Sequence, residues 1–217
     1  SLNVTFELSL LSSGGNITTR SNDFSGDAVA LTAETGFIDA SGSIVAGSGA
    51  TLSAESDIYL ATDLEAGTDL SVDSSSGGIF ASGEITAGGA GTLTADGGVE
   101  LLGELGTAGD LSVISRLGSI TASGYLESGG DVVTLTAESG DITASGYLFS
   151  ESGGAALSAA GNINLAGTLE GLTDLSLTSS AGDITLGEYG SMYTPSGDIA
   201  LTAESGNITC LLYTSDA

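Results

Sequence analysis

The chain has 217 residues, of which 28 are acidic and only two, both Arg, are basic, so its formal net charge is −26. This charge argues against nucleic acid and anionic membrane surfaces as partners, because both are polyanions. No apolar run reaches the roughly 18–20 residues of a membrane-spanning helix, so no membrane insertion by this segment is expected. Apolar residues still make up 41% of the chain, which is enough for a folded domain.

The first seventeen residues already follow a pattern that returns later in the chain. Residues 1–17, SLNVTFELSLLSSGGNI, align with residues 63–79, DLEAGTDLSVDSSSGGI. We therefore expect the sequence to begin inside a repeated coil, without the polar cap that a repeat protein needs at its end. On this interpretation it is a fragment of a longer protein.

Aliphatic residues recur about every 21 residues in three columns along the chain. The first column contains Ile17, Ile38, Ile58, Ile79, Val99, Ile120, Ile142, Ile163, Ile184 and Ile208. The second follows it by six residues through most of the chain and contains Ile44, Leu64, Ile85, Leu105, Leu126, Leu148 and Leu169. The third is assigned to Leu8, Leu31, Leu52, Leu70, Leu93, Leu111, Leu135, Leu157, Leu175 and Leu201.

The gaps on either side of the third column alternate in length. From the second column to the third they range from 6 to 9 residues, and from the third to the next first-column residue they again range from 6 to 9. A short gap on one side is often balanced by a long one on the other. This predicts that insertions are absorbed at the corners while the strands keep their register.

Short strands are predicted at each column. Most anchors occur in apolar–x–apolar triplets, such as LTA at residues 31–33 and IDA at residues 38–40, and a period of two indicates a β-strand. Gly, Asp, Asn and Ser cluster between the triplets, as in turns. A single coil cannot bury its own aliphatic residues, but a coil stacked about 4.8 Å away covers them. The sequence therefore predicts an all-β, single-stranded parallel β-helix (β-solenoid) of nine to ten coils, three short strands per coil, over residues 1–209, uncapped at both ends.

The last eight residues, 210–217, read CLLYTSDA and match no coil. They resemble the translated read-through of a sequencing adapter, so we expect a non-native tail here; the alternative is a natural strand that leads into a C-terminal cap. Cys210, the one cysteine of the chain, cannot form an internal disulfide. It is not expected to act as a nucleophile or a metal ligand.

The composition argues against an enzyme. Some β-helix proteins act on acidic polysaccharides, and such sites need cationic groups for the substrate's carboxylates or a basic side chain for proton transfer. The chain has no His, and its two Arg residues, Arg20 and Arg116, are predicted to lie on different corners several coils apart. Pairs of carboxylates could hydrolyse a glycoside, but none is distinguished by a motif. We expect no catalysis and no cofactor.

Calcium is the one cation that the pattern leaves open. Asp recurs at predicted turns, usually after Gly, at Asp110, Asp131, Asp141, Asp174, Asp183 and Asp198. Stacked carboxylates could share a hard cation, but the glycine-rich calcium-binding nonapeptide is absent and Asp after Gly is ordinary in turns. A metal site is therefore not predicted, and a calcium-dependent scaffold is kept as the third hypothesis.

Hydroxyl side chains are predicted to form a ladder on the outer face of the third strand. The residue after each third-column anchor is Ser or Thr in all ten coils: Ser9, Thr32, Ser53, Ser71, Thr94, Ser112, Thr136, Ser158, Ser176 and Thr202. A ladder that satisfies an exposed sheet face is the favoured interpretation. Ice binding is the less favoured one, since it usually needs paired Thr columns.

Aromatic residues break the polar pattern of the predicted outer surface at two places. Tyr125 and Tyr147 precede corresponding anchors and Phe149 follows the second of them, while Tyr59 and Phe80 occupy matching outward positions on adjacent coils. Solvent-facing aromatic rings could stack on sugar rings or dock a partner. The alternative is cross-strand stacking that only stabilises the sheet.

Residues 36–58, GFIDASGSIVAGSGATLSAESDI, resemble the repeat region of large bacterial exoproteins and adhesins of the filamentous haemagglutinin and autotransporter kind. The resemblance extends from residue 1 to about residue 209. It implies a right-handed β-helix that is secreted or displayed on the cell surface. It also implies a role as a stalk or adhesive shaft, with a receptor or glycan on a host or neighbouring cell as the partner.

The main functional hypothesis is a non-catalytic structural or adhesive shaft segment. A polysaccharide-binding or polysaccharide-active β-helix is the alternative. Exposed sheet edges carry unpaired backbone groups, so end-to-end self-association is also expected.

Overall fold

The computed structural model describes residues 2–3, 6–19 and 24–211, and within them the chain winds into three parallel sheets of ten strands each. Sheet A contains β1 (Leu2–Asn3), β4 (Phe24–Gly26), β7 (Ile44–Ala46), β10 (Leu64–Ala66), β13 (Ile85–Ala87), β16 (Leu105–Thr107), β19 (Tyr125–Ser128), β22 (Tyr147–Ser150), β25 (Thr168–Gly171) and β28 (Ser191–Tyr193). Sheet B contains β2 (Leu8–Ser12), β5 (Val29–Ala33), β8 (Ala50–Ala54), β11 (Leu70–Ser74), β14 (Gly91–Ala95), β17 (Leu111–Ser115), β20 (Val132–Ala137), β23 (Gly154–Ala159), β26 (Leu175–Ser179) and β29 (Ile199–Ala203). Sheet C contains β3 (Ile17–Thr18), β6 (Ile38–Ala40), β9 (Ile58–Leu60), β12 (Ile79–Ala81), β15 (Val99–Leu101), β18 (Ile120–Ala122), β21 (Ile142–Ala144), β24 (Ile163–Leu165), β27 (Ile184–Leu186) and β30 (Ile208–Cys210).

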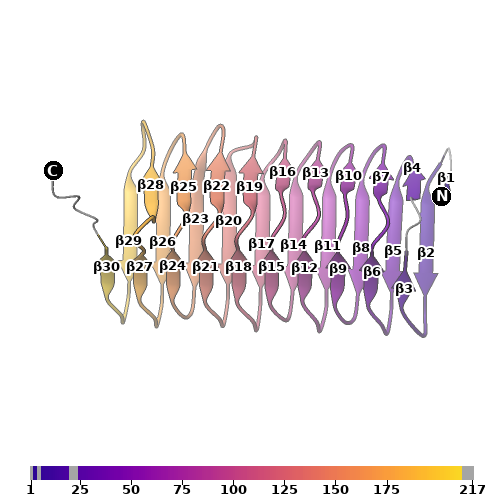
Figure 1. Ribbon diagram of the computed structural model, residues 1–217, viewed down its shortest axis with the longest axis horizontal. Helices are drawn as coiled ribbons and strands as arrows, with labels where there is room; N and C mark the ends of the chain where they lie inside the picture. The colour runs from indigo at the N-terminus through magenta and orange to yellow at the C-terminus, as the bar shows by residue number, and fades with distance from the viewer. Residues whose placement is uncertain (1, 4–5, 20–23, 212–217) are drawn as a thin grey trace.

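Each coil contributes one strand to sheet A, one to sheet B and one to sheet C, and each strand pairs with the third strand before and after it in the chain. Figure 1 shows the coils following one another along the long axis of the molecule. The predicted β-solenoid, with three strands and about 21 residues per coil, is confirmed. Nine steps of about 4.8 Å between ten strands give a stack on the order of 40 Å long.

The core is a continuous stack of aliphatic side chains between the three sheets. Along the strands, residues alternate between buried and exposed, as in the buried–exposed–buried pattern of β9 and β12. Like residues lie in register, for example Ile120, Ile142 and Ile163 in sheet C, and all three are fully buried. Fully burying one such side chain stabilises the fold by about 1.5–3 kcal/mol, so the stabilisation depends on every coil having a neighbour.

The first and second predicted columns are confirmed, but the third is wrong in register. Sheet B has two aliphatic columns two residues apart, and the predicted third column mixes them. Leu31 pairs with Leu52 and stands in line with Val72 and not with Leu70. Members of the earlier column are Leu8, Leu70, Leu111 and Leu175, and members of the later one are Leu31, Leu52, Leu93, Leu135, Leu157 and Leu201.

This correction also removes the alternating turn lengths. Sheet B strands are five or six residues long, and strands such as β5, β8 and β20 present three residues to the core, so a period of two cannot distinguish neighbouring inward positions. Measured from the true first inward residue, the step from sheet A to sheet B is six or seven residues in each coil from Ile44 to Ile199. The corner between sheets A and B is therefore nearly uniform and absorbs few insertions.

Glycine at the corner between sheets C and A lets successive coils approach closely. A Cβ atom added to Gly124 would overlap the carbonyl oxygen of Gly103 on the preceding coil, and one added to Gly146 would overlap that of Gly124. The Ser-Gly pairs before the second-column anchors therefore reflect backbone contact between coils.

Three buried serines replace alanine at the last inward position of sheet B. Ser74, Ser115 and Ser179 are fully buried, and each hydroxyl donates to a carbonyl oxygen 18 residues earlier in the chain at 2.7 Å. Buried hydroxyls without a partner would destabilise the core, but these hold the corner between sheets B and C.

The predicted tail falls mostly outside the described residues. Cys210 is the last residue of β30, where it pairs with Leu186 and is exposed. Residues 212–217 lie outside the described residues, as does Arg20.

Candidate functional site

The outer faces of the sheets carry the aromatic residues in two separate groups. Tyr59 and Phe80 lie on sheet C, whereas Tyr125, Tyr147 and Phe149 lie on sheet A. The five sequence-predicted contact residues therefore belong to two different surfaces of the solenoid.

On sheet C, the aromatic rings are stacked on one another. The centroids of Tyr59 and Phe80 are 5.1 Å apart with a 12° angle between the rings, and Phe37 meets Tyr59 edge-on at 6.3 Å. The Tyr59 hydroxyl donates to Asp57 Oδ2 at 3.0 Å, and this bond raises the pKa of Tyr59. Because the facing sides of the two rings cover each other, this group fits the interpretation of sheet-stabilising stacking. Only a small hollow of about 150 Å³ remains beside it.

On sheet A, Tyr125 and Tyr147 form a second stack. Their ring centroids are 5.4 Å apart and the ring planes differ by 5°. The Tyr147 hydroxyl donates a short hydrogen bond to the Glu170 carboxylate on the next coil, which raises the pKa of Tyr147 to about 12. The facing sides of these two rings are also occupied.

Phe149 takes part in a different arrangement. The register of β22, β25 and β28 places Phe149, Glu170 and Tyr193 in one outward column, so that a carboxylate-bearing coil separates two aromatic rings. Beside them lies a hollow of about 190 Å³, which we call the sheet A hollow; its lining includes Phe149, Glu151, Glu170, Leu172, Tyr193 and Pro195.

Tyr193 was missed at the level of the sequence. It lies in the outward position that corresponds to Phe149, because Met192 takes the inward place of Leu148 and Leu169. The usable signal was Met192 as the anchor of its coil, since the residue after each anchor of this column points outward.

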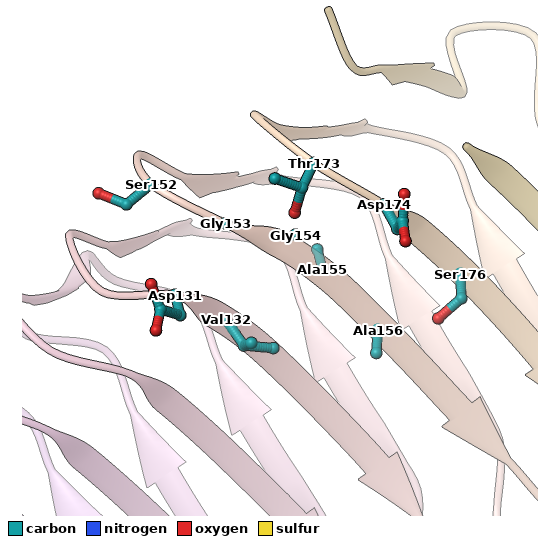
Figure 2. A pocket seen from close by; sticks show the side chains of 10 residues that line it. All are labelled: Asp131, Val132, Ser152, Gly153, Gly154, Ala155, Ala156, Thr173, Asp174 and Ser176. Atoms are coloured by element: carbon teal, nitrogen blue, oxygen red, sulfur yellow. The ribbon is translucent and has the colours of Figure 1, made fainter. Parts of the chain in front are cut away.

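A groove lies where sheet B begins in the coils that contain β20, β23 and β26. It has a volume of about 420 Å³ and follows the small residues Gly153, Gly154, Ala155 and Ala156. Figure 2 shows Asp131 and Asp174 on opposite sides of the Gly153–Gly154 segment. Asp174 Oδ1 already accepts the backbone N–H of Asp198 at 2.9 Å. The groove is shallow, and its carboxylates are not paired with a basic side chain.

The recurrent Asp residues at the corners have a structural use that the sequence did not reveal. Asp110, Asp141, Asp174 and Asp183 each accept a backbone N–H from the same corner of the following coil, at 2.6 to 2.9 Å. Asp131 and Asp198 supply two of those N–H groups. Carboxylate caps therefore join successive coils at two corners. Within the described residues, no group of three or more His, Cys, Asp or Glu side chains is placed to hold a metal ion.

Of the two basic residues, Arg20 and Arg116, the structure describes Arg116. Arg116 forms an ion pair with Asp96, with 2.9 Å between Nη1 and Oδ1. Arg20 is outside the described residues, so its expected separation from Arg116 stays a prediction.

The prediction of a hydroxyl ladder is wrong. It took the residue after each anchor of the predicted third column, and that column mixes two columns of sheet B. Sheet B has two adjacent outward columns. The first contains Ser9, Thr51, Ser71, Thr92, Ser112, Thr134 and Ser176 together with Ala30, Ala156 and Ala200. The second contains Thr32, Ser53, Thr94, Thr136, Ser158, Thr178 and Thr202 together with Leu11, Asp73 and Ile114. Neither column carries a hydroxyl in every coil, so no continuous ladder forms.

The solenoid is thus a stack of similar coils without a deep pocket among the described residues. A comparison with known families agrees with a repeat protein of this kind. Residues 118–187 match a family model described as "Hemagglutinin repeat". This range, about a third of the chain, contains β18 to β27 and most of the sheet A aromatic group. The match and the solenoid together fit the repeat region of a filamentous haemagglutinin-like protein.

No curated protein and no solved structure matched the chain. The described residues include no helix that is long and apolar enough to cross a membrane.

Proposed function

We propose that this chain is a non-catalytic shaft segment of a large bacterial exoprotein that is secreted or displayed on the cell surface. The observation that carries the proposal is the unbroken pairing of ten strands in each of three sheets around one aliphatic core. A stack of this kind lengthens by about 4.8 Å for each coil added. It therefore suits a part whose task is reach and stiffness.

Adhesion along the sides of the shaft is the second part of the proposal. The match to the hemagglutinin repeat over residues 118–187 supports it. So do the exposed rings of Tyr59 and Phe80 on sheet C and of Tyr193 on sheet A, since exposed aromatic side chains commonly mark contact surfaces. The partner would be a receptor or glycan on a host or neighbouring cell. The shaft needs no cofactor, and excess calcium should leave its melting midpoint unchanged.

An oriented adhesion assay tests the proposal. The exposed thiol of Cys210, the single cysteine, allows the chain to be coupled to beads through one end. We expect coupled beads to agglutinate erythrocytes, and beads coupled to heat-unfolded chain to remain dispersed. Failure of the folded chain to bind any cell would overturn the adhesive part.

A glycan array and a lyase assay separate this function from the alternative of a polysaccharide-active protein. The shaft proposal predicts no unsaturated product from acidic polysaccharides at any chain concentration. Release of such a product by purified chain would make the protein an enzyme and end the proposal. A glycan-array signal without cleavage would assign the adhesive contact to a sugar.

A further inference from the structure

The sheet A hollow differs from the two aromatic stacks because its rings are not stacked on each other. Phe149 and Tyr193 stand two coils apart in one outward column, with Glu170 between them. Two steps between parallel strands amount to about 9.6 Å. The two rings therefore stand on either side of the Glu170 strand, and both border the sheet A hollow.

The Glu170 side chain is held in place by a hydrogen bond. Its carboxylate accepts the hydroxyl hydrogen of Tyr147, which lies two residues before Phe149 on the neighbouring strand. The carboxylate is therefore held toward Tyr147, and it still contributes its negative charge to the hollow, which it lines together with Glu151.

The charges around the hollow select a cation. Glu151 and Glu170 both line it, no basic residue does, and the chain as a whole carries a net charge of −26. A cation in the hollow would have both Phe149 and Tyr193 beside it, and an aromatic face attracts a cation within roughly 6 Å of the ring centroid.

The other lining residues favour a cation with an apolar surface. Leu172 and Pro195 also line the hollow, together with Ser150 and Gly171, and the Leu172 and Pro195 side chains are exposed. A primary ammonium group is strongly hydrated and would lose water against these side chains. A quaternary ammonium group presents methyl groups instead and is the ligand for which aromatic sites with this chemistry are suited.

We propose that the sheet A hollow binds a quaternary ammonium group of the choline type, held between Phe149 and Tyr193 and neutralised by Glu151 and Glu170. The site belongs to coils 8–10 of the stack and does not depend on the proposed shaft function. Bead adhesion and choline binding can therefore succeed or fail separately.

The test is a titration of the folded chain with choline. Binding is monitored by proton NMR of the choline methyl groups and of the tyrosine rings. We expect binding in the millimolar range. The neutral isostere 3,3-dimethylbutan-1-ol, which has the same shape without the charge, should bind at least about fivefold more weakly if the attraction is of the cation–π kind. Equal binding of the two compounds would show an apolar pocket and overturn the proposal.

Substitutions locate the site. Phe149→Ala and Tyr193→Ala should each weaken choline binding about two- to fivefold, and Glu170→Gln should weaken it as well. The matched controls are Phe80→Ala, which removes a stacked ring on sheet C, and Glu65→Gln, which removes a carboxylate elsewhere on sheet A. Both controls should bind choline like the unchanged chain. Binding that is insensitive to Phe149 and Tyr193, or no binding up to about 100 mM choline, would overturn the assignment.

Two further ligands distinguish the source of the group. Glycerophosphocholine represents a free or polymer-linked head group, and phosphatidylcholine vesicles represent a membrane surface. Binding of either one supports the site and assigns its source. Binding of lysine amide as tight as that of choline would instead identify a general cation site and contradict the preference for methylated nitrogen.

Discussion

At the scale of single residues, the most perturbed group of the described chain is the Tyr147 phenol. Its hydrogen bond to Glu170, followed by partial burial, raises its pKa from the ordinary value of 10 to about 12. The folded state therefore holds this proton more tightly than the unfolded state. The resulting stabilisation is complete below about pH 10 and is lost as the pH rises toward 12.

An ultraviolet titration of tyrosinate formation measures this shift. The difference between the unchanged chain and Tyr147→Phe should titrate with a midpoint of about 12. In a Glu170→Gln background the same difference should move toward 10, because the negative acceptor has been removed. Glu65→Gln serves as the control and should leave the midpoint in place. If the titration midpoint is the same with and without Glu170→Gln, the hydrogen bond does not form.

At the scale of strands and corners, part of the structure was readable from the sequence and part was not. The aliphatic columns of sheets A and C were predicted correctly because their three- or four-residue strands have only two inward positions, and the larger aliphatic residue usually takes the first, as Leu64 does before Ala66. The longer strands of sheet B offer inward positions two residues apart, such as Leu70 and Val72, so periodicity alone could not fix their register.

The candidate site was less predictable than the fold. The sequence identified Tyr147 and Phe149 as outward aromatic residues. It did not predict that Tyr147 is stacked on Tyr125 while Phe149 borders a hollow. Stacking depends on side-chain rotamers and on the exact register of neighbouring coils. Tyr193 was overlooked although it directly follows Met192, the inward residue of a coil that is longer than average.

The corner glycines provide a prediction at this scale. Gly124→Ala places a methyl group against the carbonyl oxygen of Gly103, whereas Gly106→Ala, on the outer face of sheet A, meets nothing within 4 Å. Gly124→Ala should destabilise the fold by about 1–3 kcal/mol, as overpacking does, which lowers the melting temperature by about 2–4 °C per kcal/mol in a chain of this size. Gly106→Ala should be neutral or slightly stabilising. The melting temperatures are measured by circular dichroism. Equal melting temperatures of the two variants would contradict close contact between coils at this corner.

At the scale of the whole molecule, the core extends along the full stack of coils. Each coil buries its aliphatic side chains against the coils before and after it, so stability is a sum of neighbouring contacts. Carboxylate caps such as Asp141 add hydrogen bonds between the same neighbours. A structure of this kind can grow by whole coils without rearranging what is already folded, and that property supports the proposed role as a shaft.

The most direct test of this account is to add coils and measure the length of the molecule. Duplicating residues 120–183 inserts three coils, because Ile120 and Ile184 occupy the same place in sheet C three coils apart. Small-angle X-ray scattering should then show a maximum dimension about 14 Å longer, three steps of about 4.8 Å, with the radius of gyration of the cross-section unchanged. A larger cross-section without the added length would contradict the stacked solenoid and the shaft that we derive from it.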